Sequence, residues 1–453
     1  MQFDEQNPPA LKIYNCVVIG SGISGLQTAY SLQHSHGLRA EDVLVLEAQD
    51  YIGGRVKQVT SFVKGVNMDV GAEFLHGSNT ELTRFADEHN EHTKEMYCWA
   101  HGDGGPLQHT VDQGYGLYYV GSKSGNSRLL RYDSTSEDFV KLNEGLWSLA
   151  DLNEDDYSDD HSLLDYLSSL QLSDDMMRMA EAGYANTLCS TAKDLSLRRV
   201  IKWSRLWHAE GEEDGDFSLD NSYGCVVDIL RRACKIEINS PVREICYADT
   251  LVTLRTVGGV EYVSRCAVVT SSPHVLKSGL MRFDPPLSQE LQASLSTTCM
   301  HNIVKVIMKF KHRPWPKHLS GMVLSDSTFL LPEIWFKDVT DKTAPGEEAR
   351  AYAVGFTTAA YADKVATMSK DEVLRSCVEQ LDVVFSHLEP QHMSGSVDGE
   401  GGERPDSIPK PSEEFLDGML WEWNPIRYPY IGTTSLSIFS GQHLVLRIVD
   451  LYS

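Results

Sequence analysis

A glycine-rich turn between an apolar strand and a helix constrains the fold of this chain more than any other feature. Residues 17–19 are Val-Val-Ile, and they lead into a G-x-G-x-x-G pattern at residues 20–25. Its glycines allow a tight turn, the close approach of a pyrophosphate and close packing of helix on strand. The N-terminus of the helix directs unpaired N–H groups at that anion. The pattern predicts a dinucleotide site formed by Gly20, Ser21, Gly22, Ser24 and Gly25.

A second apolar strand follows the helix and ends in an acidic residue. The strand is Val-Leu-Val-Leu at residues 43–46, and Glu47 and Ala48 come directly after it. In a dinucleotide fold, an acidic side chain at this position accepts hydrogen bonds from the adenosine ribose. Two strands with a helix between them and this acid in register predict a Rossmann-like α/β fold that binds a nucleotide.

A twin glycine and an arginine indicate which nucleotide is bound. Gly53, Gly54 and Arg55 follow Glu47 after five intervening residues. This run resembles the E-x5-G-G-R signature of flavin-dependent amine oxidases, which nicotinamide enzymes do not usually carry. The resemblance implies that the cofactor is FAD and that it contacts Ala48, Gly54 and Arg55. In that family the glycines let the loop pass beside the phosphates, and the arginine helps to neutralise them. A surface charge is the alternative for Arg55, and the spacing argues against it.

Length and charge narrow the class of protein. A chain of 453 residues suits two domains, and a net charge of −24 argues against a nucleic-acid partner. No segment approaches the ~20 apolar residues that cross a bilayer, and residues 1–5 do not resemble a secretory leader. Nine scattered cysteines without metal-ligand spacing indicate reduced thiols. We therefore expect a cytoplasmic protein without a metal site or a membrane segment.

The resemblance implies an α/β fold in which a Rossmann-like FAD-binding domain of the GR2 type is interleaved with an α+β substrate domain. We expect the FAD-binding domain at residues 14–90, 218–285 and 415–453, and the substrate domain at residues 91–217 and 286–414. A helical pattern covers residues 138–207. Strands are predicted at residues 251–256 and 261–263, joined as a hairpin, and at 266–270, 303–310, 334–336 and 351–356.

A second signature lies at residues 71–77, Gly-Ala-Glu-Phe-Leu-His-Gly. It resembles the G-A-x-x-x-H-G segment of polyamine and spermine oxidases, which crosses the flavin ring. The resemblance implies that Gly71, Ala72, Glu73 and Phe74 contact the cofactor and that His76 lies in the substrate channel. Because histidine titrates near neutral pH, His76 is a candidate for exchanging a proton with the amine. A histidine that merely ends a strand before a glycine turn is the alternative.

The strand at residues 303–310 carries the candidate catalytic lysine. Val304, Val306, Met308 and Phe310 share one face of this strand, and Lys305, Ile307 and Lys309 share the other. The pattern alone favours two solvated lysines. However, the segment resembles the family segment whose lysine holds a water against flavin N5, and this match assigns Lys305 to that role.

The middle of the chain supplies two further candidates. Residues 241–245 resemble the family segment in which a residue at the position of Val242 contacts the adenine through its backbone. The strand end at residues 270–273 lies near the cofactor in that family, which implies a contact from Ser272. A core valine is the alternative for Val242.

The resemblance implies an oxidase that removes a hydride from the α-carbon of a polyamine and reduces O2 to H2O2. It covers residues 15–423, but the family's closing F-A-G-E-A/H-T segment and its helix are not found before Ser453. Part of the flavin site would then be missing, so an inactive or regulatory flavin-poor protein is one alternative. A monoamine or amino-acid oxidase on the same fold is the other.

Overall fold

The chain divides into two compact units, each with its own large sheet. Unit 1 comprises Met1–Lys57, Tyr223–Met300 and Asn424–Ser453, and unit 2 comprises Gln58–Ser222 and His301–Trp423. The structure is a computed structural model that describes residues 12–97, 115–121, 125–131, 134–158, 161–211, 215–248, 250–298, 300–339, 349–392, 408–423 and 446–448. Most of the chain after Trp423, where the closing segment of the family was sought, lies outside the described residues.

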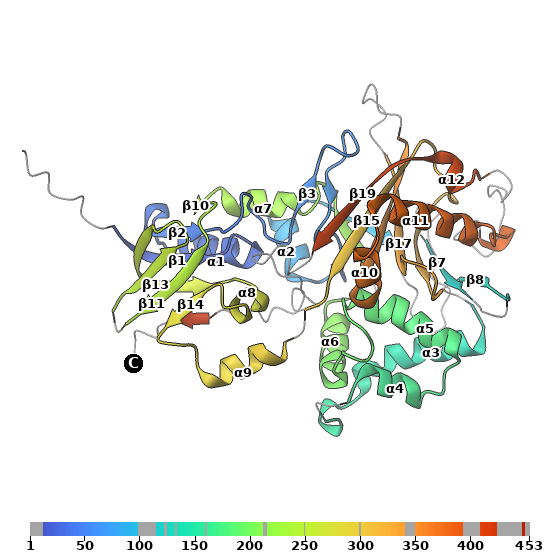
Figure 1. Ribbon diagram of the computed structural model, residues 1–453, viewed down its shortest axis with the longest axis horizontal. Coiled ribbons are helices and arrows are strands. Elements are labelled where there is room, and N and C mark those ends of the chain that lie inside the picture. Colours follow the sequence, from blue (N-terminus) through green and yellow to red (C-terminus); the bar gives the residue numbers. More distant parts are fainter. Residues whose placement is uncertain are drawn as a thin grey trace, which may run out of the picture. The chain divides into compact units, whose positions relative to one another are not determined.

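Unit 1 is built on an eight-stranded sheet with the order β10-β2-β1-β13-β12-β11-β14, in which β20 pairs with β13 (Figure 1). The neighbours β10, β2, β1 and β13 run parallel. All four residues of β2 are buried, as expected for a parallel sheet that is covered on both faces. This arrangement confirms the predicted α/β fold. The elements of unit 1 are β1 (Ile13–Ile19), α1 (Ile23–His34), β2 (Val43–Leu46), α7 (Gly224–Arg231), β10 (Lys235–Glu237), β11 (Val242–Tyr247), β12 (Val252–Thr256), β13 (Glu261–Val269), α8 (Pro273–Lys277), β14 (Arg282–Asp284), α9 (Gln289–Thr297) and β20 (Leu446–Ile448).

The predicted hairpin in unit 1 is present, but its second strand is longer than predicted. β12 and β13 pair antiparallel, and β13 continues without a break through the two strands that were predicted separately. Residues 261–264 of β13 pair with β12, and residues 263–269 pair with β1. Ser264 in the middle of β13 is polar and buried. Its Oγ is satisfied because it donates a hydrogen bond to the carbonyl of Cys266 at 2.8 Å.

Unit 2 is built on a seven-stranded sheet with the order β19-β15-β18-β17-β16-β7-β8, in which only the pair β16–β7 is parallel. The helices from α3 to α6 confirm the helical pattern predicted for residues 138–207. The elements of unit 2 are β3 (Gln58–Val59), β4 (Met68–Asp69), β5 (Leu75–His76), α2 (Glu81–Glu88), β6 (Thr93–Tyr97), β7 (Tyr115–Val120), β8 (Arg128–Arg131), α3 (Glu137–Trp147), α4 (Leu163–Ser169), α5 (Asp174–Met179), a π-helix (Ala180–Ala185), α6 (Leu197–Ala209), β9 (Asp216–Leu219), β15 (Ile303–Phe310), β16 (Leu319–Leu324), β17 (Glu333–Asp338), β18 (Ala351–Thr358), α10 (Ala359–Ala366), α11 (Lys370–Phe385), α12 (Pro411–Glu414) and β19 (Phe415–Trp423).

The compact units differ from the predicted domain boundaries mainly in three stretches. Residues 58–90 and 415–423 belong to unit 2, where β5 pairs with β9 and β19 pairs with β15. Residues 286–300 belong to unit 1, where α9 packs against α8. The roles of the two units as cofactor and substrate domains stay predictions. Among the described residues, no helix is both long and apolar enough to cross a membrane.

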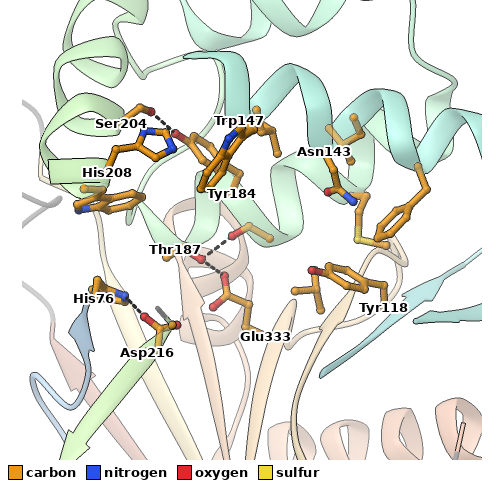
Figure 2. A pocket seen from close by; sticks show the side chains of 18 of the residues that line it. His76, Tyr118, Asn143, Trp147, Tyr184, Thr187, Ser204, His208, Asp216 and Glu333 are labelled. Atoms are coloured by element: carbon orange, nitrogen blue, oxygen red, sulfur yellow. Dashed lines mark hydrogen bonds and ion pairs between the residues drawn. The ribbon is translucent and has the colours of Figure 1, made fainter. Parts of the chain in front are cut away.

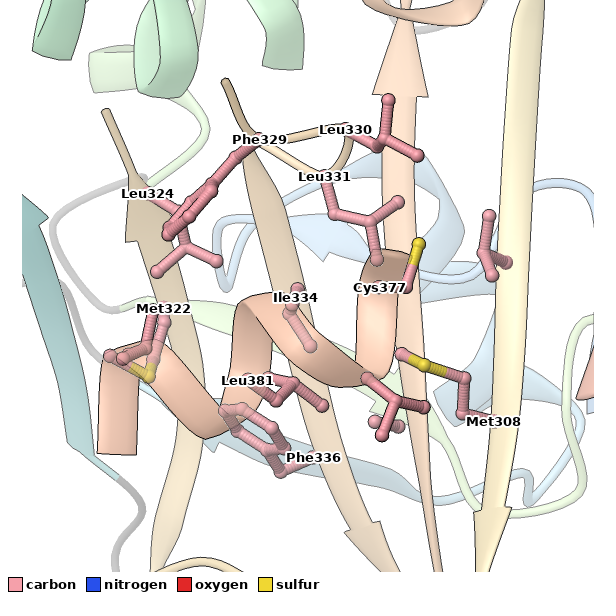
Figure 3. Packing of buried hydrophobic residues seen from close by; sticks show 14 of the residues in the cluster. Met308, Met322, Leu324, Phe329, Leu330, Leu331, Ile334, Phe336, Cys377 and Leu381 are labelled. Atoms are coloured by element: carbon pink, nitrogen blue, oxygen red, sulfur yellow. The ribbon is translucent and has the colours of Figure 1, made fainter. Parts of the chain in front are cut away.

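One face of the large sheet in unit 2 forms the main apolar core. Val304, Val306, Met308 and Phe310 of β15 are buried on this face, as the alternation predicted. Helix α11 covers them, and Figure 3 shows its residues Cys377 and Leu381 against the strands. The helix begins with a capping box, in which Ser369 and Glu372 each accept a hydrogen bond from the other's backbone N–H.

We expect Leu381→Ala to lower the free energy of unfolding by about 2–5 kcal/mol, because it removes a fully buried side chain and leaves a cavity. Val383→Ala on the same helix is the matched control, since Val383 is 45% exposed. Urea unfolding followed by circular dichroism measures both variants. Equal effects of the two substitutions would show that α11 does not pack on this face.

Candidate functional site

The glycine turn of unit 1 has the geometry that an approaching anion needs. A Cβ at Gly25 would lie 1.9 Å from the carbonyl oxygen of Gly20, so only glycine allows α1 to pack against the turn. A Cβ at Gly22 would meet nothing within 4 Å, and Gly22 caps α1 without a side-chain hydrogen bond. The N-terminus of α1 is therefore approachable on this side, as binding of a phosphate requires.

Glu47 lies beside this turn. Its Oε2 accepts hydrogen bonds from the backbone N–H of Ser21 at 2.7 Å and from the Ser21 hydroxyl at 2.6 Å, and its Oε1 accepts from the backbone N–H of Gln49 at 2.8 Å. Thr270 holds the other side of the turn, since its hydroxyl donates to the carbonyl of Ile19 at 2.9 Å. A carboxylate has about four acceptor sites, so Glu47 keeps some capacity for a ribose hydroxyl.

Arg55 supplies a buried positive charge directly after Gly53 and Gly54, which lie against the turn. The preceding Gly54 has a φ of +60°, and a Cβ there would lie 3.1 Å from the Cα of Gly22. The Nη1 of Arg55 is buried and has no hydrogen-bond partner in the described part of the chain. Burial lowers the pKa of Arg55 to about 10. An unpaired buried donor on a guanidinium fits a phosphate, and together with Glu47 and the turn it fits the phosphate and ribose groups of FAD.

Four other predicted cofactor residues of unit 1 have mainly structural contacts. The carbonyl of Ser24 accepts a hydrogen bond from the Thr28 hydroxyl at 2.7 Å, and Ala48 follows Glu47 at the end of β2. Val242 is buried in the apolar core of the unit, which agrees with the alternative of a packing residue. Ser272 caps α8. The cofactor contacts proposed for these residues stay predictions.

In unit 2, a buried carboxylate joins two lysines. Glu73 Oε2 lies 2.6 Å from Lys305 Nζ, and Glu73 Oε1 forms an ion pair with Lys337. Lys305 is 4% exposed and also donates to the carbonyl of Asp69 at 3.0 Å. Burial alone would raise the pKa of Glu73, but the charges and hydrogen bonds of Lys305 and Lys337 lower it to about 2. The same ion pair raises the pKa of Lys337 above its ordinary value, against the effect of burial. Lys305 is therefore not the solvated lysine that the strand pattern alone favoured.

The segment around Glu73 packs on the second face of the large sheet. Phe74 is buried, with its ring centroid 4.8 Å from that of Trp335. Gly71 and Ala72 follow β4, and Trp423 donates to the carbonyl of Val70 at 2.8 Å. The side chain of Phe74 is thus part of an apolar cluster in unit 2. Contacts of residues 71–74 with the cofactor stay predictions.

His76 pairs with an acidic residue that the sequence patterns did not identify. Its Nδ1 lies 2.6 Å from Asp216 Oδ1 (Figure 2). Its ring lies 5.9 Å from the ring of Trp207. The carboxylate fixes the orientation of the imidazole and favours a proton on Nδ1. Nε2 is then the ring nitrogen that can exchange a proton with a ligand.

A cavity of about 180 Å³ lies within unit 2, and His76 and Asp216 are among its lining residues. Tyr118 and Glu333 of the sheet also line it (Figure 2), as does Val323. Gly183 of the π-helix lies opposite Val323, where a Cβ would approach the valine to 3.1 Å. The other lining residues come mainly from α3, the segment that contains the π-helix, and α6: Phe139, Leu142, Asn143, Leu146, Trp147, Met179, Tyr184, Thr187, Ser204, Trp207, His208, Gly215 and Trp335.

The register of the sheet connects the cavity with Lys305. Lys305 pairs with Phe356, Phe356 pairs with Glu333, Glu333 pairs with Val323, and Val323 pairs with Tyr118. Residues that pair directly in neighbouring strands point to the same face. Lys305 and three lining residues of the cavity therefore lie in one row across β15, β18, β17, β16 and β7.

The sequence patterns missed Asp216, Glu333 and Lys337. Each has a side-chain partner that is distant in the sequence: His76 for Asp216, Asn186 and Thr187 for Glu333, and Glu73 for Lys337. The alternation of β17, in which Glu333, Trp335 and Lys337 share one face, is a signal that could have located two of them.

Comparison with known proteins identifies the family to which this chain belongs. The family model described as flavin-containing amine oxidoreductase matches residues 23–397. A lysine-specific histone demethylase 2 of Homo sapiens is 26% identical over 314 residues, which cover 67% of this chain and 36% of that protein. A probable polyamine oxidase 4 of Arabidopsis thaliana is 26% identical over 321 residues, which cover 69% of this chain and 61% of that protein. The chain thus matches less than two thirds of the length of either relative.

Solved structures with the same fold are also amine oxidases by their descriptions. A cyclohexylamine oxidase from Brevibacterium oxydans aligns with a TM-score of 0.68 and 18% identity, covering 94% of this chain and 90% of that one. A variant of putrescine oxidase aligns with a TM-score of 0.67 and 18% identity, covering 93% and 86%. At this identity the likeness shows the fold alone.

We expect Arg55→Met to weaken flavin binding roughly ten- to a hundredfold, because charge-assisted hydrogen bonds contribute about 1.5–3 kcal/mol. Visible absorbance of the purified protein, titrated with FAD, measures the affinity. Arg39→Met is the control, since the Arg39 side chain is 71% exposed and pairs only with neighbouring acids in the described structure. Unchanged flavin affinity in Arg55→Met would contradict a phosphate contact.

We expect Lys337→Met to destabilise the protein by about 3–5 kcal/mol at pH 7, because it breaks a buried ion pair. The pKa of Glu73 is about 2 in the folded protein and about 4.3 in an unfolded chain, so its stabilising effect is complete above about pH 4.3 and disappears toward about pH 2. The loss caused by Lys337→Met should therefore shrink over this range.

Urea unfolding at several pH values measures this trend. The double variant Glu73→Gln with Lys337→Met is the control, and it should be more stable than the sum of the two single losses implies. Two results together would contradict the ion-pair account: a loss of stability in Lys337→Met that does not change with pH, and a loss in the double variant that equals the sum of the two single losses.

Proposed function

Because the chain belongs to the flavin-containing amine oxidoreductase family, we propose that it is an FAD-dependent oxidase that acts on a polyamine. The reaction converts the amine, dioxygen and water into an aldehyde, a shorter amine and hydrogen peroxide. The flavin, when bound, supplies the hydride acceptor and passes the two electrons to dioxygen. The residues of this chain bind the substrate, position the water and accept the proton.

The cavity of unit 2 is the observation that carries this proposal. It combines two acidic side chains, Asp216 and Glu333, with the aromatic rings of Tyr118, Trp147 and Trp207. Carboxylates and aromatic faces are the groups that attract an organic cation, and an apolar wall suits the methylene chain between its nitrogens. The net charge of −24 also favours the approach of a cation.

Lys305 is the proposed catalytic lysine. Its two hydrogen bonds, to Glu73 and to the carbonyl of Asp69, fix the position of Nζ and leave one N–H donor of the ammonium group. That donor can hold a water molecule in a fixed place, where the water is able to attack the imine carbon. Orientation of this kind makes a large contribution to enzymatic rates.

His76 is the proposed proton acceptor. Loss of a hydride from the α-carbon requires a nitrogen lone pair, so the bound amine must be neutral at that nitrogen. His76 can take this proton on Nε2 while Asp216 stabilises the imidazolium that results.

Relatives of the chain support a polyamine as the substrate. Three of them are named polyamine oxidases and come from plants, at 24–26% identity.

We expect the purified full chain, loaded with FAD, to release one H2O2 for each spermine, spermidine or acetylated polyamine that it consumes. Lys305→Met should lower kcat by roughly a hundredfold or more, because it removes the group that positions the water. A peroxide-coupled assay measures both. Lys309→Met is the matched control, because Lys309 lies four residues further along β15 on the same face, and this variant should keep most of the activity.

No peroxide from a fully flavinated protein with any of these amines would contradict the proposed function. Equal losses in the Lys305 and Lys309 variants would contradict the role of Lys305 alone.

A further inference from the structure

Two cysteines of unit 1 lie side by side in its large sheet. Cys16 of β1 pairs directly with Cys266 of β13, and these two strands are neighbours in the sheet (Figure 1). Both side chains pack in one apolar cluster with Val18, Val43 and Val45, so they lie on the same face. Neighbouring strands lie about 4.8 Å apart, which is within the range of about 4.4–6.8 Å between the Cα atoms of disulfide-bonded cysteines. The backbone therefore already allows a disulfide at this pair.

The two thiols are reduced in this structure and are joined by a hydrogen bond. Sγ of Cys266 donates to the carbonyl of Asn15 at 3.2 Å. The proton of Cys266 is therefore directed away from Cys16, so Cys16 is the donor in the hydrogen bond between the thiols. This hydrogen bond, burial and the charge of a Cys266 thiolate raise the pKa of the Cys16 thiol far above its ordinary value. Cys16 thus stays protonated at physiological pH, in contact with the sulfur of Cys266.

The two cysteines differ in their access to solvent. Cys16 is 1% exposed, whereas Cys266 is only partly buried. A small oxidant therefore meets Cys266 first, and Cys16 is placed to react second. An accessible cysteine with a second cysteine next to it is typical of redox-sensitive sites.

We propose that Cys16 and Cys266 form a modification site for H2O2, which converts the two thiols into a disulfide. The sulfur of Cys266 attacks one peroxide oxygen, the O–O bond breaks, and Cys266 becomes a sulfenic acid as water leaves. The sulfur of Cys16 then attacks that of Cys266, the S–O bond breaks, and the hydroxyl leaves as water with the proton of Cys16. Two thiols are oxidised, and one peroxide is reduced to two waters.

The position of the pair gives this reaction a consequence for the glycine turn. β1 leads into the turn, and Thr270, directly after β13, donates to the carbonyls of Ile19 at 2.9 Å and Gly20 at 3.3 Å. A disulfide between β1 and β13 joins the two strands that hold the turn. It also closes a long loop of the chain, which stabilises unit 1 because it restricts the unfolded chain.

The source of the oxidant rests on the proposed function, because an amine oxidase releases H2O2 as a product. The chemistry of the pair does not rest on it, since added peroxide supplies the same oxidant. A disulfide that forms in response to an oxidant and is reduced again is also the kind found in reducing compartments.

Treatment of the purified full chain with H2O2, followed by alkylation of the remaining thiols and peptide mass spectrometry without reductant, tests the proposal. We expect one disulfide that links the peptides containing Cys16 and Cys266, and its loss on treatment with dithiothreitol. Cys266→Ser keeps a donor for Asn15 but should not form the disulfide. Cys234→Ser is the matched control and should still form it, because Cys234 packs against the same cluster but its Sγ lies 3.3 Å from the carbonyl of Leu230.

Urea unfolding gives a second measurement. Peroxide should shift the midpoint of the unmodified sequence and of Cys234→Ser to higher urea, and this shift should be absent in Cys266→Ser. A link from Cys16 or Cys266 to Cys234 would overturn the proposal. So would Cys16 and Cys266 that stay unlinked, or an equal shift of the midpoint in Cys266→Ser.

The test with added peroxide needs no turnover, so its result is separate from that of the oxidase assay. A chain that forms the disulfide but makes no peroxide from polyamines would refute the proposed function and not this inference. A chain that makes peroxide while Cys16 and Cys266 stay unlinked would refute this inference alone.

Discussion

The ion pairs of Glu73 with Lys305 and Lys337 are the interaction on which the site in unit 2 depends. They bring the segment between β4 and β5 onto a sheet face that would otherwise carry two unpaired lysines. A single carboxylate pairs with both lysines, and with a pKa of about 2 it remains charged at every physiological pH. Buried charges persist only when they are paired and hydrogen-bonded, and here Asp69 adds a carbonyl to Lys305. The position of the proposed catalytic lysine is thereby fixed before any ligand binds.

The large sheet of unit 2 sets the position of Lys305 relative to the cavity. One row of paired residues runs from Lys305 through Phe356 to Glu333 and continues to Val323 and Tyr118. Because strand spacing is nearly constant, the distances along the row are set by the fold and not by loops. The helices α3 and α6 and the π-helix provide the aromatic walls, and Gly183 leaves room beside Val323. The same unit therefore holds a fixed lysine and the acids suited to a cationic ligand.

The sequence was most informative where the proposed site is formed by residues of one local sequence motif. The glycine turn and Glu47 were predicted from local spacing, and Arg55 was predicted from the family resemblance. The structure places Glu47 on the turn and Gly54, the residue before Arg55, against Gly22. The alternation of residues 303–310 correctly separated the core face from the lysine face, but it could not show that Lys305 is buried. That burial depends on Glu73 and Lys337, which only the folded sheet brings together. Glu333 and Asp216 were missed for the same reason, since the side chains that contact them, Asn186 and Thr187 for Glu333 and His76 for Asp216, are distant in the sequence.

A crystal structure of the flavin-loaded chain with an unreactive diamine tests the central claim most directly. The account predicts that the diamine lies inside the cavity, with one nitrogen toward Lys305 and the methylene chain against the aromatic walls. A diamine bound outside the cavity, or Lys305 and Glu73 separated and facing solvent, would contradict the account.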